Sequence, residues 1–446
     1  MTSYKGKSVK HGDKETQKHA EAQRDVAPSP YSDPTSIAKS NVRDPYQAFR
    51  FRDFRLLFIG AFIANIGEQM VSVAIGWELY DRTGSALALG WVGLVQVIPV
   101  ILLSLPAGHM ADRLNRKNIV IVSQVILALA ALGLMALSIT RGSLLLIYGC
   151  LFIMGVAVAF ANPASTTLLP QTVPESIFEN AATWESGSWQ LASMFGPALG
   201  GLIIGLLHSA ALVYGLNAGA ALVSAILIML LRGKRRDVPV SETTTFGALL
   251  EGFKFLRSTQ VILAAITLDM FAVLLGGATT LLPIYAKDIL HVGPTGLGWL
   301  RAAPSIGAIC VSLSLAHLPP LKKAGRTLLW VVAGFGVATC IFGVSHSFWL
   351  SLLMLCALGG LDNVSVVIRS TLLLTRTPDA MRGRIAAVNS IFIGASNQLG
   401  GFESGLVAQL FGPIISVAGG GIGTVLVVLL VALLWPEMRR LGTLSE

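Results

Sequence analysis

The feature that most constrains this chain is a series of long apolar segments, each near the length that an α-helix needs to cross a bilayer. About 20 apolar residues span the hydrocarbon core. We count twelve such segments, with expected bounds 55–80, 86–110, 118–140, 143–169, 180–207, 210–231, 260–286, 295–317, 326–345, 347–373, 384–410 and 412–435. Charged residues are only 13% of the 446, against roughly 25% in soluble proteins. The pattern predicts an all-α membrane protein with twelve transmembrane helices.

Positive charge is unevenly divided between the loops that join these segments. The net charge of +9 alone would also suit a nucleic-acid surface, but alternate loops carry nearly all of the Arg and Lys. The opposite loops hold only Arg82, Arg141 and Lys287. Because cytoplasmic loops are enriched in Lys and Arg, we expect a multi-pass protein of the cell inner (cytoplasmic) membrane with both termini in the cytoplasm. Nucleic acid is not an expected partner.

Enzymatic and metal chemistry find little support in the sequence. The chain has no Walker A, G-x-S-x-G or HExxH motif, which are the signatures of common ATP-driven and hydrolytic sites. All four cysteines lie in predicted spans and no CxxC occurs, so they suit packing better than a metal site. We therefore expect no enzyme activity, no metal and no cofactor.

The polar stretches divide the chain into five expected regions. Residues 1–45 are too poor in aliphatic side chains to fold alone and are expected to be a disordered cytoplasmic tail. Six spans in 46–231 form an N-terminal bundle, 232–259 is a cytoplasmic linker, and 260–435 is a C-terminal six-helix bundle. Residues 436–446 are a short cytoplasmic tail.

The two halves repeat each other in sequence. Leu-Gly-Trp at 89–91 returns at 297–299, 208 positions later, and Thr-Leu-Leu at 167–169 returns at 371–373, 204 positions later. The offset of 204 also matches Gly196 with Gly400 and Gly201-Leu202 with Gly405-Leu406. Duplicated bundles with a binding site at their interface are a transporter architecture. The alternative is a duplication that serves packing alone.

The short turn between the second and third predicted spans reads GHMADRLNRKN over 108–118. It resembles the G-x-x-x-D-R-x-G-R-R/K signature of the major facilitator superfamily, with Asn115 in place of the second glycine. The matching residues are Gly108, Asp112, Arg113, Arg116 and Lys117. The resemblance implies a cytoplasmic gate, in which this cluster latches the two halves while the outside is open, and Gly108 would let helices approach closely.

Arg382 and Arg384, just before the eleventh span, are the expected partners of that latch. They could meet Asp112 or Glu179 across the cytoplasmic face. Anchoring of the topology alone explains these basic residues equally well.

Two further stretches narrow the resemblance. Gly196, Pro197, Gly200 and Gly201 resemble the GPxxGG antiporter motif of drug-exporting facilitators, and GxxxG spacing permits close helix packing. The segments 162–181 and 378–384 resemble the third drug:proton antiporter family, which includes enterobactin exporters, macrolide efflux proteins and lysophospholipid translocators. Many proton-driven exporters carry an arginine in the fourth span, and this chain has none there.

Ionisable residues inside spans are therefore the candidates for proton coupling or the substrate cavity. Such residues are costly in a membrane and usually face the interior or water. Our candidates are Glu68, Asp269 and Asp362 as proton carriers, Arg301 as a partner of Asp269 or of an anionic substrate, and Glu185 with Gln190 beside Trp184 and Trp189. Arg369 is a second possible partner for an acid. Fixed ion pairs are the structural alternative for the acids, and interfacial anchoring is the alternative for the tryptophans.

The sequence thus favours a secondary transporter that exports a small organic molecule, drug or siderophore, in exchange for protons. One alternative is a proton-independent facilitator or flippase of a siderophore or lysophospholipid. A third is a membrane receptor on the same fold that transports nothing. Expected partners are the substrate, protons and membrane lipids, and we expect a monomer.

Overall fold

A computed structural model describes residues 44–232, 251, 253–257, 259–317, 323–440 and 442. Most of the predicted tail 1–45 and of the predicted linker 232–259 lies outside this range, as does the end from 443. Tyr46–Glu446 form one compact unit, and the division of that unit into two bundles and a linker stays a prediction.

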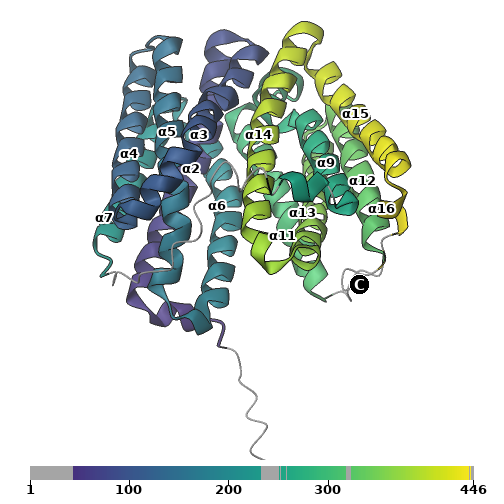
Figure 1. The fold of residues 1–446 in the computed structure, drawn as a ribbon. Helices are drawn as coiled ribbons and strands as arrows, with labels where there is room; N and C mark the ends of the chain where they lie inside the picture. Colours follow the sequence, from purple (N-terminus) through teal and green to yellow (C-terminus); the bar gives the residue numbers. More distant parts are fainter. Residues whose placement is uncertain are drawn as a thin grey trace, which may run out of the picture. The chain divides into compact units, whose positions relative to one another are not determined.

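The described chain consists of helices and short connections (Figure 1), and no strand occurs in it. In the first half these are η2 (Gln47–Arg50), α2 (Arg52–Thr83), α3 (Ala86–Arg113), α4 (Arg116–Ile139), α5 (Leu144–Thr172), η3 (Glu175–Ile177), α6 (Phe178–Leu207) and α7 (Ala211–Met229). In the second half they are α9 (Gln260–Leu275), η4 (Gly277–Leu281), α10 (Leu282–Ile284), η5 (Tyr285–Ile289), α11 (Gly293–His317), α12 (Ala324–Val344), α13 (Phe348–Arg376), α14 (Asp379–Phe411), α15 (Pro413–Leu434) and α16 (Pro436–Arg440).

Eleven helical segments of the described chain are long and apolar enough to cross a membrane. They correspond to eleven of the twelve predicted spans, because α9, η4, α10 and η5 together make the seventh. The predicted span 384–410 lies in α14, which is not among the eleven. Its sequence explains this, since α14 carries Arg382, Arg384, Glu403 and a run of Ser, Asn and Gln. At 33 residues α14 is nevertheless long enough to span a bilayer.

The repeat seen in the sequence reappears in where the helices begin. α4 begins at Arg116 and α12 at Ala324, which are 208 positions apart. α5 begins at Leu144 and α13 at Phe348, 204 positions apart. Most of the change of offset lies within the helices themselves, because α4 has 24 residues and α12 has 21. The sequence matches at 89–91 and 167–169 lie on either side of this change.

Within each half, small residues bring the helices together. α2 packs against α6 and α7, while α11 packs against α13, and α12 against α13 and α15. Gly359 of α13 lies so close to α11 that an added Cβ would stand 2.5 Å from the Cα of Pro304 and nearer still to its carbonyl group. In a bilayer, where apolar surfaces gain little by meeting each other, such close packing is what holds helices together.

Between the halves, α3 packs against α14 and α6 against α11. These contacts between the halves are closest near one end of the helices. We call the end where α2 stops and α3 starts the contact end, because the close approaches between the halves lie there. The other end, where Arg113, Arg116 and Lys117 join α3 to α4, is the basic end.

We predict that Gly359→Ala destabilises the protein by about 1–3 kcal/mol, because the new methyl group would overlap the backbone of α11. Gly219 of α7 is the matched control, since a Cβ there meets no described atom within 4 Å. Gly219→Ala should leave stability unchanged or raise it by about 0.5–1 kcal/mol. Thermal unfolding in detergent measures both; equal effects of the two substitutions would contradict the packing described here.

Candidate functional site

A buried ion pair joins α9 to α13 inside the second half. Asp269 is 6% exposed and Arg369 is 5% exposed. The Nη1 group of Arg369 donates a hydrogen bond to Oδ2 of Asp269. Asp362, two helical turns before Arg369 on α13, lines with Asp269 a cavity of about 10 Å³ that extends to α12, which is room for roughly one water molecule. Two acids and one guanidinium therefore form a compact charged group within the membrane-spanning part.

Arg369, rather than Arg301, is the partner of Asp269. α9 packs against α12, α13, α14 and α15, so a residue of α13 reaches Asp269 directly. Arg301 lies on α11, half-buried, and makes no ion pair within the described residues. The role predicted for Arg301 towards Asp269 is thus taken by the second candidate that the sequence offered.

Glu68 and Glu185 lie apart from this group and are exposed. α2 contacts α6 through Gln69 and α7 through Gly67, so Glu68 between them projects away from both contacts. Neither acid has a hydrogen bond or ion pair within the part of the chain that the structure describes. Glu68 and Glu185 are thus exposed, whereas Asp269 and Asp362 line the small cavity.

Gln190 and the tryptophans of α6 have separate surroundings. Nε2 of Gln190 donates to the carbonyl oxygen of Ser305 on α11, at 3.2 Å, and so bridges the two halves. Trp184 packs edge-on against Phe49 and Phe58, with ring centroids 4.9 and 6.2 Å away. Trp189 is 48% exposed. Trp184 therefore packs within the first half, while Trp189 is exposed. The choice between a substrate site and interfacial anchoring for these tryptophans stays a prediction.

The halves approach most closely at two equivalent glycine crossings. A Cβ added to Gly201 of α6 would stand 2.7 Å from the Cα of Gly298 on α11, and one added to Gly405 of α14 would stand 2.9 Å from the Cα of Gly90 on α3. Gly201 and Gly405 are related by the repeat, as are Gly90 and Gly298. The sequence revealed these residues as repeated, and the structure gives the reason, since each pair is a backbone contact between the halves.

The antiporter-like stretch of α6 uses its glycines on two faces. A Cβ at Gly196 would lie 2.9 Å from the carbonyl oxygen of Ile66, and one at Gly200 would lie 3.0 Å from the Cα of Met70, both on α2. Gly201 faces α11, and the carbonyl of Pro197 lies where a Cβ on Gly298 would have to fit. One face of α6 is thus fixed within its own half, while the other meets the opposite half.

Charged groups close the contact end around the last turn of α2. Nζ of Lys287 in η5 lies 2.6 Å from Oδ1 of Asp81 and 5.9 Å from the centre of the Tyr80 ring. The Tyr80 hydroxyl donates a hydrogen bond to Asp288. The sequence identifies Lys287 only as one of the few basic residues on this side. The signal that could have found this cluster is the repeat, because Tyr80 and Asp288 are 208 positions apart.

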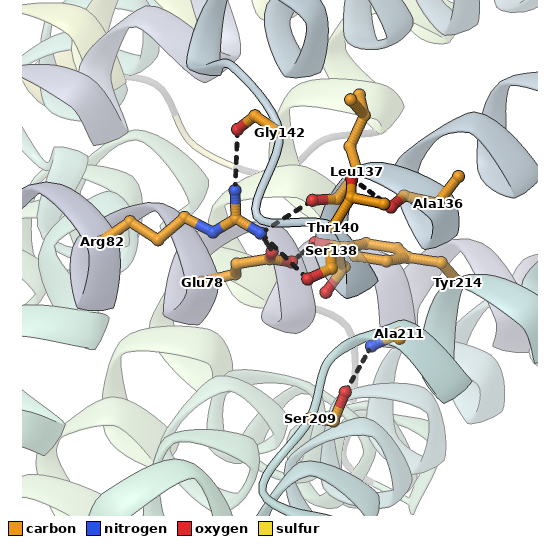
Figure 2. Close-up of polar contacts among 10 residues, drawn as sticks. All are labelled: Glu78, Arg82, Ala136, Leu137, Ser138, Thr140, Gly142, Ser209, Ala211 and Tyr214. Carbon is orange, nitrogen blue, oxygen red and sulfur yellow. Dashed lines mark hydrogen bonds and ion pairs between the residues drawn. The ribbon is translucent and has the colours of Figure 1, made fainter.

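The same turn of α2 is bound firmly to its own half (Figure 2). Arg82 pairs with Glu78 and donates to the carbonyl oxygens of Leu137 and Gly142, each at 3.1 Å. The Tyr214 hydroxyl of α7 donates to Glu78 at 2.8 Å. A cation at the last carbonyls of α4 is favourable for the helix dipole. The cluster therefore holds Tyr80 and Asp81 on a rigid support.

The predicted gate residues at the basic end make local contacts. Nζ of Lys117 donates to the carbonyls of Met229 and Leu231, each at 2.8 Å, at the end of α7. Nε of Arg116 donates to the carbonyl of Ala111 at 3.4 Å. Arg113 is exposed, and the side chain of Asp112 lies outside the described residues.

The second set of gate residues lies at the start of α14. Arg382 donates to the carbonyl of Leu374 at 3.1 Å, and Arg384 pairs with Glu251. A latch between the halves at this end stays a prediction.

The prediction that Gly108 lets helices approach closely is wrong for this conformation. A Cβ there meets no described atom within 4 Å, and the same holds for Gly187 of α6 and Gly383 and Gly394 of α14. The physical reason is that the halves meet at the contact end, so among the described residues these glycines at the basic ends of α3, α6 and α14 have no close neighbours across the interface.

Comparisons with known proteins agree with this architecture. A family model described as "Transmembrane secretion effector" matches residues 43–442. The chain is 26% identical to the multidrug efflux pump Tap of Mycolicibacterium fortuitum, over 80% of this chain and 89% of Tap. It is 26% identical to the enterobactin exporter EntS of Citrobacter koseri, over 87% of this chain and 92% of EntS.

Solved structures share the fold at low identity. A POT family transporter in complex with 5-aminolevulinic acid superposes with a TM-score of 0.69 at 13% identity, covering 87% of this chain and 97% of that one. A bacterial homologue of the lysosomal transporter Spinster, inward-facing and unoccupied, gives 0.64 at 14% identity, with 89% and 98% covered.

We predict that Arg369→Met lowers the free energy of unfolding by about 3–5 kcal/mol, because it leaves the Asp269 carboxylate buried without a partner. The double variant Asp269→Leu/Arg369→Met should recover most of that loss. Lys287→Met is the control, since its partner Asp81 is 56% exposed and such pairs contribute about 0–1 kcal/mol. Thermal unfolding in detergent decides; a single variant no less stable than the double one would refute the pairing.

Proposed function

The chain belongs to the family of transmembrane secretion effectors, and on that premise we propose that it exports a small organic molecule across the cell inner membrane by alternating access. The membership confirms the resemblance to major facilitator exporters, and it confirms that the chain is a multi-pass transporter rather than an enzyme. The names of the relatives support a drug or a siderophore-like molecule as the substrate class.

Alternating access requires an interface between the halves that can separate, and the glycine crossings meet that requirement. Backbone contacts at Gly201–Gly298 and Gly90–Gly405 are close but involve no charged group, so separating them breaks no ion pair. The polar contacts across the contact end are few and partly exposed, as with Lys287 and Asp81. We infer that this end opens as a unit. The uncharged glycine crossings are the observation that supports this proposal most directly.

The distribution of Arg and Lys supports an orientation. Basic residues gather at the basic end, which the positive-inside rule assigns to the cytoplasm. The conformation is then one that is closed to the outside. In the opposite state the basic ends of α3 and α14 would meet, and Asp112 would latch to Arg382 or Arg384, with Arg113, Arg116 and Lys117 close by.

Protons are the proposed driving ion. Glu68 is exposed on α2. Asp269 and Asp362 line one water-sized cavity, and Arg369 pairs with Asp269. Burial disfavours the charged form of a carboxyl group, so conformational change around such groups can take up or release a proton. Arg301, Glu185 and Gln190 are proposed to line the substrate path. A proton-independent facilitator or flippase is the second candidate, favoured by the absence of an arginine in the fourth span.

We predict that substrate flux across the liposome membrane depends on an imposed pH gradient. This dependence should be lost in Glu68→Gln and in Asp269→Asn. The reason is that neither amide can exchange a proton. Flux of a fluorescent dye or labelled drug, together with the pH inside the liposomes, measures both. Glu185→Gln is the matched control for an exposed acid on a neighbouring helix; it should change the apparent substrate affinity and keep the gradient dependence.

Two results separate the alternatives. Flux that ignores the gradient in the unmodified protein supports the facilitator or flippase. Absence of flux with every ligand that stabilises the protein against heat supports a receptor that transports nothing, and would contradict the proposed export.

A further inference from the structure

Each half of the protein carries a groove at the basic end, and the repeat relates the two. The groove of the second half has a volume of about 520 Å³ and lies between α12 and α13. The groove of the first half, of about 460 Å³, lies among α3, α4 and α5. The six residues that line the second-half groove are Lys323, Arg326, Thr327, Trp330, Val331 and Leu361. Subtracting 208 from the first five and 204 from the sixth gives Asn115, Asn118, Ile119, Val122, Ser123 and Ala157, and all of these line the first-half groove.

The two grooves share their position but differ in charge. Lys323 and Arg326 stand where the first half has Asn115 and Asn118. Both cations are exposed, and neither makes an ion pair within the described residues. Arg326 is held by a hydrogen bond from Nε to the carbonyl oxygen of Arg439, at 3.3 Å. Its Nη groups make no hydrogen bond within the described residues, so they can face a ligand while the side chain is oriented.

The second-half groove is also amphipathic along its length. Its cations lie at the start of α12, where the helix dipole favours an anion, and Thr327 lies beside them. Further along α12 the groove is lined by Trp330, which is 78% exposed, and Val331, and α13 contributes Leu361. An exposed tryptophan next to basic residues is typical of the layer where lipid headgroups meet acyl chains.

We propose that this groove binds an anionic phospholipid, with the phosphate held by Lys323 and Arg326 and an acyl chain lying along Trp330, Val331 and Leu361. Charge complementarity selects the headgroup, and the apolar part selects a lipid over a free phosphate. The first-half groove, with amides in place of the cations, does not make that selection.

The bound lipid would lie next to the buried acids. Val331 and Leu361 line the groove on one side, and both also line the small cavity that contains Asp269 and Asp362. An acyl chain over these two side chains would cover the lateral approach to that cavity.

Titration of the full-length purified protein with phosphatidylglycerol, followed by native mass spectrometry, tests the site. Lys323→Gln/Arg326→Gln should weaken the tightest binding about 10- to 30-fold, as expected for the loss of two basic residues near a headgroup. The control Lys254→Gln/Arg257→Gln removes the same charge from exposed residues outside the groove and should change binding less than about twofold. Thermal unfolding without lipid verifies that both variants are folded.

Three further arms define the ligand. Trp330→Ala should weaken phosphatidylglycerol binding, and neither phosphatidylcholine nor inorganic phosphate should displace the bound lipid at equal concentration. The reciprocal variant Asn115→Lys/Asn118→Arg/Val122→Trp should create a second tight site. Unchanged affinity in Lys323→Gln/Arg326→Gln, an equal loss in the control, or displacement by inorganic phosphate would each overturn the proposal.

Discussion

The close approach of backbones at two glycine crossings is the constraint on which the rest of this structure depends. Helices in a bilayer gain little from burying apolar surface against each other, so their association relies on close packing and on polar contacts. Gly201 with Gly298 and Gly90 with Gly405 supply that packing between the halves, twice, in the same geometry. A side chain at any of the four would push the halves apart. The contact is consequently specific in position and yet separable, which is the combination that a moving interface needs.

Charge is arranged around this interface in two ways. The pair Asp81–Lys287 is partly exposed at the rim of the contact end, where it can break and re-form at small cost. The pair Asp269–Arg369 is buried within the second half, where breaking it is expensive. The first suits a contact that opens during each cycle. The second suits a group that stays assembled, with Asp362 lining the same cavity, and it is the proposed site of proton coupling.

The apolar pattern predicted most of the fold because it records the lengths of single helices, and the repeat predicted which helices of the two halves are equivalent. Eleven spans and the equivalence of α4 with α12 follow from them. α14 was harder to identify as a span from hydropathy, since a helix that lines an interface keeps polar residues that lower its mean hydropathy. The partner of Asp269 depends on which helices are in contact. Neither the apolar pattern nor the repeat distinguishes Arg301 from Arg369 as that partner. The Tyr80–Asp288 contact and the place of Gly108 depend on which end is closed, which a single sequence does not specify.

The most direct test of a two-state interface is the distance between the halves at both ends. In a cysteine-free background, spin labels at Leu207 and Leu410 report the contact end, and labels at Phe178 and Arg376 report the basic end; all four residues are exposed. Introducing Gly201→Leu with Gly405→Leu should lengthen the first distance and shorten the second. A first distance that lengthens while the second stays unchanged would contradict a pivoting of the two halves about a shared interface.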